Sequence, residues 1–201
     1  RESYKNFDLK SVFQILLNFS NLDLSSFYFD IRKDCLYCDP RDSDKRKSSL
    51  TLLNVILNSL LRWFAPILSF TTEEIYQLVS KKNKSIHLEK FLIFPKKFLN
   101  SKLHDKWSEL IKIRDACNLS IEEKRSKKEI GSSLEAELLI KLDEKLSKIS
   151  KNIDFAELCI TSKSTIEVHD KDGIEVQTKK AIGNKCPVCW KISKEPCARH
   201  S

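Results

Sequence analysis

Four side chains of metal-binding type are concentrated in the last sixteen residues of this 201-residue chain. Cys186 and Cys189 are separated by two residues, and after seven intervening residues the pair Cys197 and His200 repeats that spacing. Two such pairs supply the soft and borderline ligands of a tetrahedral structural zinc site. Because protein ligands fill all four positions, we expect one structural zinc ion per chain and no reactive water. The alternative is chance spacing in a cysteine-rich sequence.

The cysteine count and the hydropathy pattern indicate the compartment. Seven cysteines are an odd number, and no secretion signal accompanies them, so reduced thiols fit better than disulfides. Lysines interrupt almost every hydrophobic stretch, which leaves no segment that could span a bilayer. We therefore expect a cytoplasmic protein without a membrane partner. Methionine is absent and residue 1 is arginine, so we also expect the chain to be part of a longer protein.

An excess of basic residues favours a polyanionic partner. The chain has 36 lysines and arginines against 28 acidic residues, a net charge of +8, although a lysine-rich proteome could account for much of this excess. The distribution is more informative than the total, because Glu195 is the single acidic residue beyond position 178. The basic residues of that segment are Lys179, Lys180, Lys185, Lys191, Lys194 and Arg199.

The first half of the chain shows helical periodicity. Apolar residues recur three, four and seven positions apart in segments 9–16 and 24–31. A longer helix should begin at Ser43, whose hydroxyl can cap it, and should end before Pro66. Its buried face is expected to hold Leu50, Leu53, Leu57, Leu60, Leu61 and Phe64.

A fourth helix is expected behind the pair Thr71 and Glu74, which has the spacing of a capping box. Four amphipathic helices joined by short loops predict a helical bundle. The apolar face of this fourth helix would consist of Ile75, Leu78 and Val79.

The period changes in the second half, after one more helix. This helix should start at Leu103 and end near Gly131. Beyond it, short alternating segments predict strands, and Asp172 with Gly173 predicts a hairpin turn. The expected strands are residues 137–142, 155–161, 165–169 and 174–178. The predicted fold is mainly α, with a helical domain at 1–100, a long helix and small α/β module at 101–180, and a zinc knuckle at 181–201.

Two segments resemble helix signatures of the anticodon-binding domain in bacterial isoleucyl-tRNA synthetases: 24–38 (LSSFYFDIRKDCLYC) and 63–74 (WFAPILSFTTEE). Segment 130–136 (IGSSLEA) resembles the element after the long helix of these enzymes, and 183–190 (GNKCPVCW) resembles their C-terminal zinc module. Valyl and leucyl enzymes share the first two signatures, whereas the Cys-x-x-Cys-Trp sequence favours the isoleucyl members. The resemblance runs in register along the chain, from about residue 4 to residue 200.

The resemblance implies a class I aminoacyl-tRNA synthetase that uses ATP to attach isoleucine to its tRNA. It implies that this region binds the anticodon arm of isoleucine tRNA, and that isoleucine and ATP bind upstream domains, where catalysis and editing also occur. No catalytic residue is expected here, and a monomer is expected. The family usually completes its zinc site with a second Cys-x-x-Cys, where this chain has Cys197 and His200.

Five residues are candidates for contact with tRNA. Trp190 could stack on an unpaired base while Lys185 and Lys191 hold the backbone, or it could pack over the metal loop. Arg32 and Lys33 could contact phosphates, and a solvated helix end accounts for them equally well.

Several other motifs are given no functional role. Segment 145–149 (KLSKI) looks like the mobile lysine loop that steadies ATP in such synthetases, but that loop precedes the helical domain in the family, so an exposed helix is preferred. Cys35 and Cys38 have knuckle spacing without a second pair nearby, which favours packing or a free thiol. The histidines without a role are His87, His104 and His169.

Two alternatives remain open at this stage. One is a free-standing zinc-bearing nucleic-acid module, of the kind found at the end of some DNA-repair glycosylases. The other is the same region of a valyl or leucyl enzyme.

Overall fold

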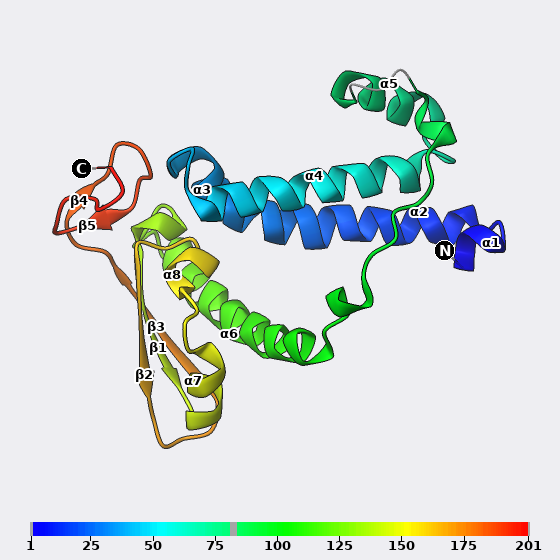
Figure 1. Ribbon diagram of the computed structural model, residues 1–201. Coiled ribbons are helices and arrows are strands. Elements are labelled where there is room, and N and C mark those ends of the chain that lie inside the picture. Colours follow the sequence, from blue (N-terminus) through cyan, green and yellow to red (C-terminus); the bar gives the residue numbers. More distant parts are fainter. Residues whose placement is uncertain (1, 81–83, 201) are drawn as a thin grey trace. The chain divides into compact units, whose positions relative to one another are not determined.

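The computed structural model describes residues 2–80 and 84–200, and it divides into two compact units (Figure 1). The N-terminal unit comprises residues 1–95, and the C-terminal unit comprises residues 96–201. Among the described residues, no helix combines the length and the hydropathy needed to cross a membrane.

The described residues of the N-terminal unit form helices and no strands. In chain order they are α1 (Glu2–Lys5), α2 (Leu9–Asn18), the π-helix η1 (Phe19–Phe29), α3 (Asp30–Cys38), α4 (Asp44–Phe64), α5 (Ser69–Val79) and the short 3₁₀ helix η2 (Ile86–Leu88).

The helices α2, η1 and α3 follow one another without a break, so the expectation of two separate helices at 9–16 and 24–31 was wrong. The junction residues Asn18, Phe29 and Asp30 all keep helical backbone angles. No glycine or proline lies between α2 and α3, and the chain therefore widens into π turns instead of leaving the helix.

The predicted start of α4 is confirmed. The Ser43 hydroxyl accepts a hydrogen bond from the Arg46 N–H, and Pro66 follows the last turn. Leu61 is buried as expected, but Leu50 is half exposed. Its neighbour Ser49 is buried instead, where its hydroxyl can bond to the carbonyl of the preceding turn.

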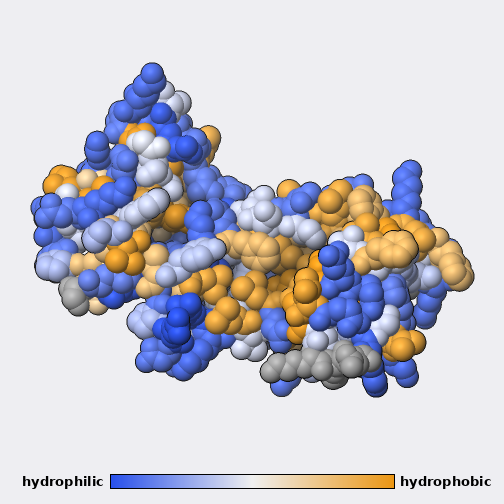
Figure 2. All heavy atoms as spheres, turned by 90° about the horizontal axis from the view of Figure 1, so that it is seen from above, coloured by the Kyte–Doolittle hydropathy of each residue, from blue (hydrophilic) through white to orange (hydrophobic). Residues whose placement is uncertain are grey.

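The buried face of α5 differs from the prediction. The helix begins at Ser69, without the expected capping box, and it buries Thr72 and Tyr76. Tyr76 packs with Leu61 of α4 and Ile86 of η2, so an aromatic ring with a polar tip occupies the place expected for aliphatic residues. Figure 2 shows hydrophobic side chains at the surface of this unit. Those exposed on α5 include Phe70, Ile75, Leu78 and Val79.

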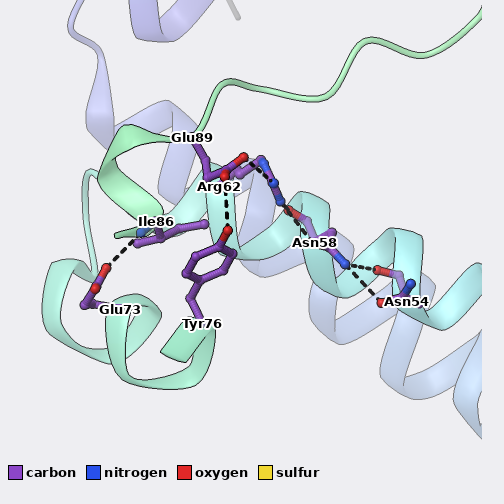
Figure 3. A network of polar contacts seen from close by, with 7 residues as sticks. All are labelled: Asn54, Asn58, Arg62, Glu73, Tyr76, Ile86 and Glu89. Atoms are coloured by element: carbon purple, nitrogen blue, oxygen red, sulfur yellow. Dashed lines mark hydrogen bonds and ion pairs between the residues drawn. The ribbon is translucent and has the colours of Figure 1, made fainter. Parts of the chain in front are cut away.

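A polar network fastens the segment after α5 to α4 (Figure 3). The Arg62 guanidinium donates to Glu89 at 2.8 Å and to the Asn58 carbonyl at 2.8 Å. The Tyr76 hydroxyl donates to the other oxygen of the Glu89 carboxylate at 3.1 Å. Glu73 accepts a hydrogen bond from the backbone N–H at the start of η2. Glu89 thus gives both buried side chains, Arg62 and Tyr76, a charged acceptor. Arg62 Nε is also buried but has no hydrogen-bond partner among the described residues.

The C-terminal unit combines helices with two small sheets. Its elements are η3 (Lys96–Phe98), α6 (Ser101–Ser126), η4 (Ser133–Glu135), β1 (Ala136–Leu142), α7 (Glu144–Ser150), α8 (Phe155–Leu158), β2 (Lys163–Val168), β3 (Ile174–Lys180), β4 (Asn184–Lys185) and β5 (Ile192–Ser193).

The long helix α6 forms as predicted but ends earlier. Asn100 caps its start by accepting a hydrogen bond from the Leu103 N–H. After Ser126 the chain turns at Lys128, whose φ of 59° lies in the left-handed region, so Gly131 is not the terminating residue.

The strand β1 lies in the middle of the three-stranded sheet, in the order β2-β1-β3. It is parallel to β2 and antiparallel to β3. Every second residue of β1 is completely buried, which suits a central position, whereas the edge strands are largely exposed. The buried residues of β1 are Ala136, Leu138, Ile140 and Leu142.

Two further predictions for this unit were wrong. Residues 155–161 were expected to form a strand, but they begin with the helix α8, because the Asp154 carboxylate accepts hydrogen bonds from the Ala156 and Glu157 N–H groups. The turn at Asp172 and Gly173 joins strands at opposite edges of the sheet, so it is not a hairpin turn. Local spacing could not reveal that β1, earlier in the sequence, lies between them.

Candidate metal centre

The ribbon formed by β4 and β5 positions the first ligand pair. In this ribbon Lys185 pairs with Ile192, which places Cys186 directly after β4. The Cys186 N–H donates to the Lys191 carbonyl at 2.9 Å, and the Trp190 N–H donates back to the Cys186 carbonyl at 3.0 Å. These two hydrogen bonds close the turn that carries Cys186 and Cys189.

The second pair closes a similar turn, in which the His200 N–H donates to the Cys197 carbonyl at 2.9 Å. The C-terminal tail, residues 181–200, thus brings the ligand atoms of both pairs together. The ligand atoms of Cys186, Cys189, Cys197 and His200 all lie within 4.8 Å of one another. No other group of three or more such residues with metal-site geometry occurs in the part of the chain that the structure describes.

The distances within this cluster fit a tetrahedral metal site. Cys189 Sγ lies 3.7 Å from Cys197 Sγ, and His200 Nδ1 lies 3.5 Å from Cys186 Sγ and 3.3 Å from Cys197 Sγ. A tetrahedral zinc ion with bonds of about 2.3 Å to sulfur and about 2.0 Å to nitrogen separates its ligands by roughly 3.5–3.8 Å. The four residues could therefore hold a metal ion with little rearrangement.

Two of the three thiols in the cluster have a lowered pKa, which favours the thiolate, the metal-binding form of cysteine. The pKa of Cys186 is lowered to about 6, mainly because the Cys189 backbone N–H donates to its sulfur. The pKa of Cys197 is also lowered, mainly by the Arg199 backbone N–H. Burial raises the pKa of Cys189 to about 11, so this thiol needs the charge of a metal ion to lose its proton.

Trp190 is the exposed aromatic residue of the tail. Its side chain remains 57% exposed, and its φ of 65° is a left-handed conformation that is rare for a bulky residue. Lys185 Nζ lies 5.0 Å from the centre of the Trp190 ring, within cation–π distance. The ring therefore has an open surface beside a positive charge.

Ser162 ties the tail to the sheet, and Gly183 lets the backbone pass close to Ser193; neither was among the predicted site residues. The Ser162 hydroxyl accepts a hydrogen bond from the Ile192 N–H at 2.6 Å and donates to the Leu134 carbonyl. Gly183 has a φ of 139°, and a Cβ atom there would lie 2.1 Å from the Ser193 carbonyl oxygen. The available sequence signal for Gly183 was its rarity, because the chain has three glycines. Ser162 carried no such signal, because its contact with Ile192 spans 30 residues.

The remaining candidate residues are distributed over both units. Lys191 contributes its carbonyl to the knuckle turn. Arg32 and Lys33 lie on α3 of the N-terminal unit, where Lys33 pairs with Asp30 at 2.6 Å. Cys35 is buried against Ser49, as a packing role requires.

Comparison with known proteins identifies relatives over nearly the whole chain. The family described as the anticodon-binding domain of tRNA ligase matches residues 1–140. The isoleucine–tRNA ligase of Pelagibacter ubique (strain HTCC1062) is 60% identical over 198 residues, which cover 98% of this chain and 22% of the relative. The isoleucine–tRNA ligases of Bartonella henselae and Bradyrhizobium diazoefficiens are 38% and 40% identical, and each match covers 96% of this chain. The chain spans about a fifth of the length of these relatives.

Proposed function

Because the chain belongs to the anticodon-binding domain family of tRNA ligases, we propose that it forms the C-terminal tRNA-recognition region of an isoleucine–tRNA ligase. The observation that carries the proposal is the identity of 60% to one such ligase along 98% of the chain. In this role the region binds the anticodon arm of isoleucine tRNA. The rest of the enzyme binds isoleucine and ATP and joins the amino acid to the tRNA in the cytoplasm, with the protein acting as a monomer.

The proposal assigns a structural zinc ion to Cys186, Cys189, Cys197 and His200. The donor set of three thiols and one imidazole suits zinc, which prefers sulfur and nitrogen ligands in a tetrahedral arrangement. When bound, zinc supplies a fixed centre that holds the tail in one conformation. All four ligands come from the protein, so the ion takes no part in catalysis.

In the proposed complex, Trp190 stacks on an unpaired base of the anticodon loop, and Lys185 and Lys191 neutralise the adjacent phosphates. The open ring surface and the neighbouring positive charge support this assignment. Arg32 and Lys33 are proposed as further phosphate contacts, and the exposed position of Lys33 leaves room for such a contact. A free-standing nucleic-acid module is disfavoured because the match extends through the helices as well as the knuckle.

The test is a Trp190→Ala variant of the full-length enzyme. Loss of one base stack worth about 1–3 kcal/mol should weaken the affinity for isoleucine tRNA by roughly five- to hundred-fold. Isoleucine activation, measured by pyrophosphate exchange, should be unchanged, because the stack contributes nothing to the activation step. Trp190→Phe should retain much of the affinity, since an aromatic face remains.

Zinc content must be measured in both variants, because a tryptophan that only packs over the metal loop would lower the affinity by loosening the ion. Normal tRNA charging by zinc-loaded Trp190→Ala enzyme would contradict the stacking role. Absence of isoleucine-dependent pyrophosphate exchange in the unchanged full-length enzyme would contradict the assignment to isoleucine.

A further inference from the structure

A cleft separates the edge of the three-stranded sheet from the β4–β5 ribbon, within the C-terminal unit. Its volume is about 540 Å³, inside the range of about 300–1,000 Å³ that is typical of ligand sites. Three separate segments form its walls: the β1–β2 edge, the chain between β3 and β4, and the residues from β5 onward. The lining residues used below are Lys163, Ile182, Ile192, Ser193, Lys194 and Glu195.

The walls of the cleft are fixed by contacts at both ends of the ribbon. Gly183 allows the backbone to pass so close to Ser193 that any side chain would collide with it. The Ser162 hydroxyl binds the Ile192 N–H and so ties the ribbon to the sheet. Lys163 is held at the sheet edge by an ion pair of 2.9 Å with Glu137. The cleft is thus a defined feature of the fold.

The side chains in the cleft combine three kinds of recognition. Ile182, which is 71% exposed, and Ile192 supply apolar surface. The Ser193 hydroxyl accepts a hydrogen bond from the Glu195 N–H at 3.2 Å, so its own proton is free to be donated to a ligand. The Glu195 carboxylate can accept hydrogen bonds from amino groups, and Lys194 supplies a positive charge. A nucleotide matches this set, with its apolar base face, polar base edge and phosphate.

The closeness of Trp190 to a cleft residue in the chain adds a second argument. Trp190 is two residues before Ile192 in the chain, and Lys185, which lies over the Trp190 ring, pairs with Ile192 across the ribbon. The exposed aromatic ring therefore lies in the loop that joins β4 to β5, and the cleft is lined by Ile192 and Ser193 of β5. The surrounding segment carries six basic residues and one acidic residue between positions 179 and 200, which favours an anionic polymer.

We propose that this cleft binds one unpaired nucleotide of RNA, next to the nucleotide that stacks on Trp190. The base lies against Ile182 and Ile192, Ser193 and Glu195 contact its edge, and Lys194 contacts the phosphate. A base inside a duplex cannot enter, because both of its faces are covered by its neighbours. The inference rests on the proposed function and extends it from one base contact to two consecutive ones.

The test uses the full-length, zinc-loaded protein and a labelled RNA hairpin with the anticodon stem and loop of isoleucine tRNA. Ile182→Glu places a negative charge and a polar chain where the base should lie. The matched control is Val168→Glu, which makes the same change at another exposed apolar position, 60% exposed. Val168 lies at the far end of β2 from Lys163, about 17 Å along the strand.

Ile182→Glu should weaken binding of the hairpin about five- to fifty-fold, whereas Val168→Glu and Ile182→Leu should stay within about twofold of the unchanged protein. A fully paired RNA duplex of equal length should bind weakly and should not distinguish Ile182→Glu from Val168→Glu. Zinc content must remain one ion per chain in every variant.

Equal hairpin affinities for Ile182→Glu and Val168→Glu would overturn the inference. So would an equal loss on the duplex, because the cleft would then contact phosphates alone. If the unchanged protein failed to bind the hairpin, the proposed function itself would be contradicted, and this inference with it.

Discussion

The Ser162 hydroxyl connects the three-stranded sheet to the C-terminal tail by accepting a hydrogen bond from the Ile192 N–H at 2.6 Å. The same hydroxyl donates to the Leu134 carbonyl. One side chain thus satisfies a donor and an acceptor from two distant parts of the chain. The orientation of the tail on the sheet depends on this serine.

Replacing Ser162 with alanine should loosen the tail without removing the metal. An unsatisfied Ile192 N–H and Leu134 carbonyl cost about 1–3 kcal/mol, and zinc affinity should change little because no ligand is altered. Hydrogen exchange of the Ile192 amide should become at least about tenfold faster. The control is Ser132→Ala, at an exposed serine nearby. Unchanged exchange at Ile192 would show that the hydroxyl does not hold the ribbon.

Changes at His200 test the fourth metal ligand. His200→Ala should weaken zinc binding at least about tenfold, whereas His200→Cys should keep one ion per chain, because a four-cysteine site is a common structural zinc site. The sulfur of a cysteine can reach the place of Nδ1, the ring nitrogen nearer the backbone. Metal analysis after dialysis against a weak chelator measures both, with His169→Ala as the control. Full zinc retention by His200→Ala would remove this histidine from the ligand set.

Glu89→Ala should destabilise the N-terminal unit by about 1–3 kcal/mol. The change leaves the Arg62 side chain, which is 9% exposed, without its carboxylate and takes the acceptor from the Tyr76 hydroxyl. Native-state hydrogen exchange of the α5 amides reports the loss. The matched control is Glu74→Ala, an exposed glutamate on α5, which should change stability by less than about 0.5 kcal/mol. Equal effects of the two variants would contradict this account.

Asp143 should make the stability of the C-terminal unit depend on acidic pH. Its carboxylate accepts hydrogen bonds from the Leu146 and Gly173 N–H groups, and the first of these is the main reason why its pKa lies below the ordinary value of 3.8. A lowered pKa stabilises the fold above the ordinary value, and this stability is lost as the pH falls below it.

The corresponding experiment compares melting temperatures of the unchanged protein and Asp143→Asn across acidic pH. The variant should melt lower near neutral pH, because its side chain carries no charge, and the two curves should converge at pH values well below 3.8. The control is Asp170→Asn, at an exposed residue before the β2–β3 turn. Its melting temperature should equal that of the unchanged protein at every pH. A constant difference between the curves down to the lowest pH would argue against titration of Asp143.

Features set by neighbouring residues were predictable from the sequence. The cap at Ser43 depends on residues only a few positions apart, and so does the clustering of Cys186, Cys189, Cys197 and His200. The local pattern therefore contains the information. The strand segment at 137–142 was also predictable, because its alternation matches the burial of β1.

Features set by distant residues were not predictable in this way. The face that α5 buries is chosen by Glu89 and Ile86, which follow the helix and bind Tyr76. The position of β1 between β2 and β3 depends on pairing with segments as distant in the chain as Lys180, the partner of Ala136. The contact between Ser162 and Ile192 joins segments 30 residues apart, and no local pattern marks either residue.

The strand order of the sheet has a consequence for how the protein is made. The central strand β1 is synthesised first, and its partners β2 and β3 follow it, with Ala136 pairing as far along the chain as Lys180. While the chain is growing, β1 has two unpaired edges and a row of apolar side chains, which are prone to pair with other chains. A chain truncated before β3 would therefore leave one edge of β1 unpaired and prone to aggregate, and completion of β3 removes this hazard.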